Sequence, residues 1–141
     1  MRKRTQARES ALKVMYQKEM TGETANDSLR SFFDSQPKMD LDLRDFVIKL
    51  VEGVENDTAA LDQKVEAVAE NWSMKRMAVL DRNILRIAMF EMTAMTETPP
   101  KVVINEAVNL AKKYSGENSG KFVNGVLDKL MRQIADVKPA S

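Results

Sequence analysis

The residues best suited to chemistry in this chain are cations at its start. The heptamer RKRTQAR at residues 2–8 contains Arg2, Lys3, Arg4 and Arg8. Guanidinium groups pair with phosphate through two parallel hydrogen bonds, and arginine-rich segments recognise RNA by such pairing and by stacking on unpaired bases. We interpret this stretch as a candidate basic arm for RNA. The alternative is a solvated, frayed terminus.

A second candidate is the turn YSGENSGKF at residues 114–122. Two glycines, small polar residues and a lysine at a helix start expose backbone N–H groups that could hold a phosphate. The spacing is not that of a P-loop, because only three residues separate Gly116 from Gly120 and Phe122 stands where a hydroxyl is needed. A capped turn between two helices, with Phe122 in the core, is the alternative.

We expect structural roles for two further residues, Arg86 and Gly125. Arg86 is the one charged residue in the apolar run 84–90, and a buried charge without a partner costs several kcal/mol. We predict that Glu106 pairs with it and that the pair sets helix register. Gly125, inside the last helix, predicts close helix packing, since glycine there costs about 1 kcal/mol relative to alanine.

Composition excludes most catalytic chemistry. The chain has no cysteine and no histidine, which rules out zinc fingers, thiol nucleophiles, imidazole bases and histidine-ligated metals. The carboxylates are scattered, and Asp40, Asp42 and Asp45 are explained by a helix N-terminus, whose dipole favours negative charge. We therefore predict a binding protein with no catalytic residue, no metal and no cofactor.

The length of 141 residues predicts one compact domain, residues 1–141. No apolar run is long enough to span a membrane or to follow the basic start as a signal peptide. We expect a cytoplasmic protein with no membrane partner.

The net charge of +1 conceals an uneven distribution. Residues 1–18 carry six cations and one carboxylate, a net charge of +5. Residues 19–70 carry 5 basic and 13 acidic side chains, a net charge of −8, and residues 71–141 carry 11 and 7, a net charge of +4. The first helix is thus a basic pole on a nearly neutral body.

Apolar residues follow a helical period almost everywhere, and no long stretch alternates with period two. We predict an all-α fold of six or seven helices, with residues 41–72 forming one helix or two around a break at 56–58. The expected helix ends are Thr5, Gly22, Asp40, Ser73, Thr98, Gly116 and Gly120.

A resemblance to a known family extends over nearly the whole chain and is strongest in four blocks. They are TQARESALKVMYQ at 5–17, DRNILRIAMFEM at 81–92, KVVINEAVNLAKKYSG at 101–116 and GKFVNGVLDKL at 120–130. In these blocks the chain resembles the NusB family of bacterial transcription antitermination factors.

The resemblance implies about seven helices in two packed subdomains, here residues 5–72 and 73–136, without catalytic activity. It also implies binding, together with the ribosomal protein NusE, to the boxA element of nascent ribosomal-operon RNA. The complex would associate with RNA polymerase and other Nus factors, suppress premature, Rho-dependent termination and assist ribosomal RNA synthesis and maturation.

By motif position, the resemblance assigns RNA binding to Arg2, Lys3, Arg4, Arg8, Lys121 and Phe122, and NusE binding to Tyr16, Asp81 and Asn118. The chain departs from the family at two places. Thr5 and Gln6 shorten the arginine run, which would weaken RNA binding. Asn118 replaces an acidic residue that is frequent in relatives, which would strengthen it.

Two other interpretations stay open. One is the accessory domain of a ribosomal RNA methyltransferase, although the chain lacks a glycine-rich nucleotide loop and a nucleophilic cysteine. The other is a structural protein that forms a homodimer through the acidic residues 19–70.

Overall fold

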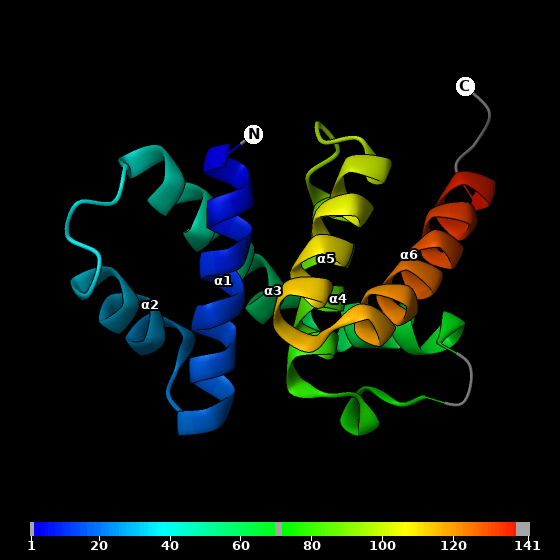
Figure 1. The fold of residues 1–141 in the computed structure, drawn as a ribbon, viewed down its shortest axis with the longest axis horizontal. Helices are drawn as coiled ribbons and strands as arrows, with labels where there is room; N and C mark the ends of the chain where they lie inside the picture. Colours follow the sequence, from blue (N-terminus) through cyan, green and yellow to red (C-terminus); the bar gives the residue numbers. More distant parts are fainter. Residues whose placement is uncertain (1, 70–71, 138–141) are drawn as a thin grey trace. The chain divides into compact units, whose positions relative to one another are not determined.

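The computed structural model describes residues 2–69 and 72–137. Within these ranges the backbone forms six α-helices, one turn of 3₁₀ helix (η1) and no strand, which confirms the predicted all-α fold class (Figure 1). None of these helices is long and apolar enough to cross a membrane. The elements are α1 (Arg2–Thr21), α2 (Ala25–Asp34), α3 (Leu41–Val68), η1 (Met74–Arg76), α4 (Val79–Ala94), α5 (Pro100–Ser115) and α6 (Glu117–Val137).

The chain divides into two compact units, residues 1–57 (unit 1) and 58–141 (unit 2). The division lies inside α3, at Asp57, whose φ of −121° and ψ of 18° are not helical. The break predicted at residues 56–58 is therefore confirmed, as a kink at Asp57 where two helical stretches of α3 meet. Asn, Asp and Thr side chains compete for backbone hydrogen bonds, which explains why the helix is interrupted here. The subdomain bounds 5–72 and 73–136 that the resemblance implies stay a prediction.

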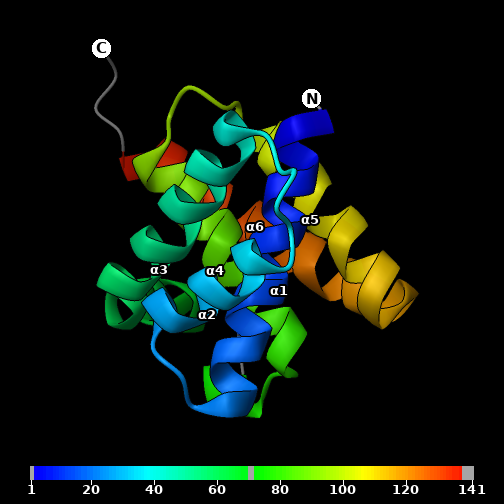
Figure 2. The same ribbon diagram turned by 90° about the vertical axis from the view of Figure 1, so that its left-hand side faces the viewer.

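Unit 1 packs α1 against α2 and contains the first part of α3 (Figure 2). Gly22, with φ of +77°, follows α1 as predicted, because glycine adopts this left-handed conformation without a steric penalty. Asp40 Oδ1 accepts a hydrogen bond of 2.9 Å from the backbone N–H of Asp42, which confirms the predicted cap of α3.

The predicted cap at Thr5 is wrong, because α1 begins at Arg2 and Thr5 lies within the helix. Arginine, lysine, glutamine and alanine all have high helix propensity, so the basic stretch continues the helix towards the N-terminus. The cations at residues 2–8 thus belong to helical turns and not to an irregular arm.

Unit 2 is built around α4, which packs against both α5 and α6 (Figure 1). Ile84, Leu85 and Met89 are almost completely buried, as expected for a helix that is apolar nearly all round. α5 and α6 also pack against each other on either side of Gly116, whose φ is +103°.

Several predicted helix ends in unit 2 are displaced. α6 begins at Glu117 and not near Gly120, and Pro99, not Thr98, holds the cap position of α5. Ser73 precedes η1 without a capping side-chain hydrogen bond, and α4 starts only after Ala78. Short-range signals mark the turns correctly, but packing decides by a few residues where each helix begins.

Candidate nucleic-acid interface

The predicted RNA-binding cations of unit 1 lie in the first turns of α1. The side chain of Arg2 lies outside the described residues. Lys3 Nζ forms an ion pair of 2.6 Å with Asp40 Oδ2 and lies 3.9 Å from Asp42 Oδ2. The hydrogen bond to Asp40 raises the pKa of Lys3, and the same bond lowers the pKa of Asp40. A phosphate that binds Lys3 must therefore compete with this carboxylate.

Arg4 and Arg8 lie one turn apart on the same face of α1, and both guanidinium groups sit over the ring of Phe46. The distances to the ring centroid are 4.7 Å for Arg4 and 5.8 Å for Arg8. Arg4 is exposed, whereas Arg8 is only 3% exposed. Arg4 is thus in contact with solvent, while an RNA role for Arg8 stays a prediction that would require this buried group to move.

A cavity of about 370 Å³ in unit 1 carries mixed charge. It is lined by Lys3, Arg4, Asp42, Leu43, Asp45, Phe46 and Lys49. Three cations face two carboxylates here, so the attraction for a polyanion is weakened.

In unit 2, Lys121 is exposed and Phe122 is half-buried in the second turn of α6. The Phe122 ring meets Trp72 edge to face, with centroids 6.2 Å apart and an angle of 64° between the planes. Trp72 is 50% exposed. Trp72 lies beyond the last turn of α3, and this position explains why its ring is not buried with the apolar side chains of that helix.

These side chains line a groove of about 350 Å³, called here the α6 groove. Its lining consists of Val68, Ala69, Trp72, Lys121, Phe122, Gly125, Val126 and Lys129, with no carboxylate among the described residues. The prediction of close helix packing at Gly125 is wrong, because a Cβ there would meet nothing within 4 Å. The close approach is at Gly120, where a Cβ would lie 2.7 Å from Lys112 Cγ.

The predicted partner-binding residues divide between the units. Tyr16 lies on α1 in unit 1 and is 43% exposed. Asp81 lies in the first turn of α4 and is 9% exposed, and its Oδ2 accepts a 3.3 Å hydrogen bond from Ser119 Oγ. Asn118, next to Ser119, is exposed. The structure therefore brings Asp81 and the first turn of α6, which contains residues 118 and 119, together within unit 2.

The Asp81 carboxylate is held in an unfavourable environment. Burial raises its pKa, and the hydrogen bond from Ser119 opposes this effect in part. Its Oδ1 atom is buried and has no hydrogen-bond partner within the described part of the chain. A partner that donates a hydrogen bond here would relieve the cost of burying this oxygen.

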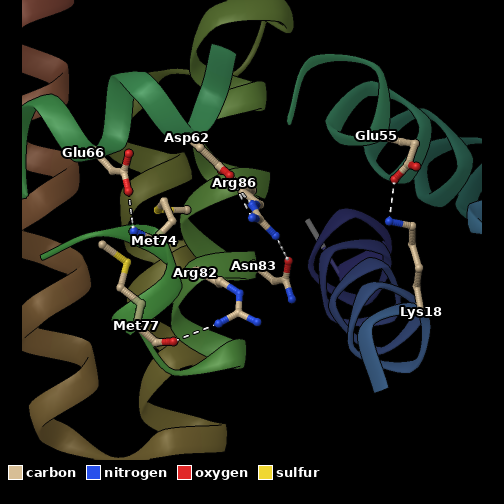
Figure 3. Close-up of polar contacts among 9 residues, drawn as sticks. All are labelled: Lys18, Glu55, Asp62, Glu66, Met74, Met77, Arg82, Asn83 and Arg86. Atoms are coloured by element: carbon tan, nitrogen blue, oxygen red, sulfur yellow. Dashed lines mark hydrogen bonds and ion pairs between the residues drawn. The ribbon is translucent and has the colours of Figure 1, made fainter. Parts of the chain in front are cut away.

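Arg86 takes a different partner from the one expected. Its Nε and Nη2 atoms donate to Asp62 Oδ1 and Oδ2 at 2.8 and 2.9 Å, and Nη1 donates to Asn83 Oδ1 at 3.0 Å (Figure 3). The carboxylate that forms the bidentate pair is thus Asp62, and a contact between Arg86 and Glu106 stays a prediction. Asp62 comes from α3 and was not singled out by the sequence pattern.

Two more polar contacts hold the segment after Trp72. Glu66 Oε2 accepts a 2.6 Å hydrogen bond from the backbone N–H of Met74, and Arg82 Nη1 donates to the Met77 carbonyl at 2.9 Å (Figure 3). The backbone N–H of Trp72 itself donates to the Ala69 carbonyl at 3.0 Å. These bonds position the irregular segment that carries the indole.

The described residues contain no group of three or more acidic side chains placed to hold a metal ion. What the two units offer instead is exposed cations beside aromatic rings, an arrangement suited to single-stranded nucleic acid.

Comparison with known proteins gives consistent results. A family model described as the NusB family matches residues 5–132. The chain is 48% identical over 128 residues to the transcription antitermination protein NusB of Anaeromyxobacter dehalogenans (strain 2CP-1 / ATCC BAA-258), which covers 91% of this chain and 89% of that protein.

Two solved structures are similar over almost the whole chain. One is described as antitermination factors NusB and NusE in complex with double-stranded RNA; its TM-score is 0.86 at 29% identity, covering 94% of this chain and 98% of that one. The other is described as a plectonemic RNA supercoil; its TM-score is 0.91 at 29% identity, covering 98% and 100%.

Proposed function

The chain belongs to the NusB family, and from this premise we propose that it is a transcription antitermination factor. Together with NusE it binds the boxA element of nascent ribosomal-operon RNA and, through RNA polymerase and other Nus factors, suppresses premature, Rho-dependent termination. It thereby assists ribosomal RNA synthesis and maturation, in the cytoplasm, where nascent transcripts are made. It is a binding protein and not an enzyme.

The observation that carries this proposal is the family match over residues 5–132, joined to the likeness to a NusB structure that contains NusE and RNA. The surface chemistry supports it. Lys121 is exposed beside the aromatic rings of Phe122 and Trp72, and Arg4 is exposed on α1. Cations of this kind bind phosphates, and aromatic rings accept unpaired bases.

The NusE contact is proposed at Asp81, Asn118 and Tyr16. Asp81 offers a buried carboxylate oxygen without a hydrogen-bond partner in the described structure, beside the exposed Asn118. Tyr16 offers a half-exposed ring with a polar tip, which is typical of residues in protein interfaces.

The test is binding of fluorescently labelled boxA RNA and of a scrambled RNA of equal length, each with and without NusE, followed by anisotropy. We expect boxA to bind more tightly than the scrambled RNA, and NusE to increase the difference. Equal affinities in all four measurements would overturn the proposal.

Salt dependence gives a second readout. If the basic residues neutralise about four phosphates of a single strand, the slope of log affinity against log salt is about −3. Lys121→Glu is expected to make this slope shallower. The control is Lys101→Glu, which makes the same charge change at the start of α5, away from the α6 groove. Identical slopes for both variants would contradict the assignment of Lys121.

A homodimer is the competing assembly. Sedimentation of the chain with and without boxA RNA distinguishes the two cases, because RNA dissociates a dimer that covers the RNA surface and leaves an unrelated dimer intact.

A further inference from the structure

Trp72 is a large apolar side chain that is half exposed and yet held in place. Its backbone N–H donates a hydrogen bond to the Ala69 carbonyl, and its ring contacts Phe122 edge to face. Two residues further on, the Met74 N–H donates to the Glu66 carboxylate on α3. A positioned aromatic surface of this kind loses little conformational entropy when a ligand covers it.

The α6 groove beside Trp72 has the charge pattern of an anion site. Lys121 and Lys129 lie on α6 eight residues apart, or about 12 Å along the helix axis. Among the described residues neither lysine has an ion-pair partner, and the groove lining contains no carboxylate. The two lysines therefore line the same groove as the aromatic pair, and their ammonium groups attract phosphates there.

The groove also has room for a flat ligand. Gly125 lies between the two lysines in sequence, and a Cβ at this position would meet nothing within 4 Å. The apolar side chains of Val68 and Val126 complete the lining. The groove thus combines two aromatic rings, open space at Gly125 and two lysines. This combination matches an unpaired nucleotide, which has one planar base between two phosphates.

We propose that Trp72 and Lys129 complete an unpaired-nucleotide pocket in the α6 groove. The indole stacks on the base, and Lys129 binds the phosphate on the side opposite Lys121. This inference rests on the proposed function and adds two residues to the RNA surface that the family resemblance does not assign.

The first test uses the fact that Trp72 is the one tryptophan of the chain. Its fluorescence reports on the α6 groove alone, while anisotropy of labelled boxA RNA reports on binding anywhere. We expect RNA to quench Trp72 with the same midpoint as the anisotropy change. RNA binding without any change in Trp72 emission would overturn the pocket and leave the proposed function intact, whereas absence of any RNA binding would overturn the function itself.

Variants separate stacking from a merely structural role. Trp72→Ala is expected to weaken boxA binding roughly tenfold, and Trp72→Phe, which keeps a stacking ring, to recover most of the loss. Circular dichroism during urea unfolding checks that each variant remains folded. Unchanged affinity of a folded Trp72→Ala variant contradicts the proposal, and equal losses for the alanine and phenylalanine variants contradict stacking.

Lys129 and Gly125 test the rest of the pocket. Lys129→Gln is expected to reduce the salt slope by about 0.7, the value for one phosphate on a single strand, while Lys101→Gln leaves it unchanged. Gly125→Leu adds a good helix former that fills the groove, so it is expected to weaken RNA binding and to abolish the quenching of Trp72. Wild-type slope and wild-type quenching in these two variants would overturn the pocket.

Discussion

Arg86 and Asp62 form a bidentate ion pair that ties α4 to the second part of α3, with N–O distances of 2.8 and 2.9 Å. Both side chains are largely buried, at 15% and 22% exposure. Such a pair fixes the orientation of the two helices, because the planar guanidinium donates two parallel hydrogen bonds to the carboxylate.

Asp62→Ala is expected to lower the free energy of unfolding by about 2 kcal/mol, somewhat less than for a fully buried pair, because the guanidinium loses its bidentate acceptor. Urea unfolding followed by circular dichroism measures the change. The neighbouring exposed Gln63→Ala is the control and should change stability by about 0.5 kcal/mol or less.

The double variant Asp62→Ala with Arg86→Ala completes the cycle. Its loss of stability is expected to be smaller than the sum of the two single losses, since each single variant leaves the other half of the pair without its partner. Strictly additive losses would show that the two side chains do not interact in solution.

Gly116 and Gly125 should respond in opposite directions to alanine. Gly116 has φ of +103° and ψ of −178°, a backbone region that only glycine adopts readily, so Gly116→Ala is expected to cost about 2 kcal/mol. Gly125 is helical with open space around it, so Gly125→Ala should stabilise the protein by up to about 1 kcal/mol. Thermal unfolding of both variants measures the two signs, and a stabilising Gly116→Ala would contradict the turn geometry.

Asp81 should make stability depend on pH in a defined direction. Burial raises the pKa of Asp81 in the folded state, because it disfavours the charged carboxylate. The contribution of protonated Asp81 to the free energy of unfolding is therefore fully present below the ordinary aspartate pKa of about 3.9, and it is lost as the pH rises through the raised pKa. The stability of Asp81→Asn relative to wild type is therefore expected to increase from pH 4 to pH 7. Urea unfolding at each pH measures the difference in free energy of unfolding between Asp81→Asn and wild type. The control is Glu97→Gln, which removes one exposed carboxylate. A difference that stays constant or falls as the pH rises would contradict a raised pKa of Asp81.

The ion pair of Lys3 with Asp40 should restrain RNA binding. Asp40→Asn keeps a side chain that can cap α3 but removes the charge that competes for Lys3, so boxA affinity is expected to rise roughly twofold at low salt. Salt screening should erase the gain. Anisotropy titrations measure the effect, with Asp34→Asn as an exposed control of equal charge change; the same gain in both variants would assign it to net charge alone.

The sequence by itself determined features that depend on neighbours along the chain. Helical periodicity identified an all-α fold with α4 at the centre of its unit, and the residue types at Gly22, Asp40 and Gly116 identified turns and caps. These signals are readable because helix formation and capping involve groups only a few residues apart. The family resemblance added the function, because it extends over nearly the whole chain and is strongest in four blocks of residues.

The tertiary structure decided which distant residues meet. Asp62 forms the bidentate pair with Arg86, across 24 positions, and Ser119 reaches Asp81 across 38. Trp72 joins Phe122 at a groove that neither residue predicts alone, and burial removes Arg8 from the exposed cations. These outcomes depend on the angle and register with which helices pack, and many local sequences are compatible with several registers. Local chemistry therefore predicted the helices, and packing decided which distant side chains lie beside Lys121 and Phe122.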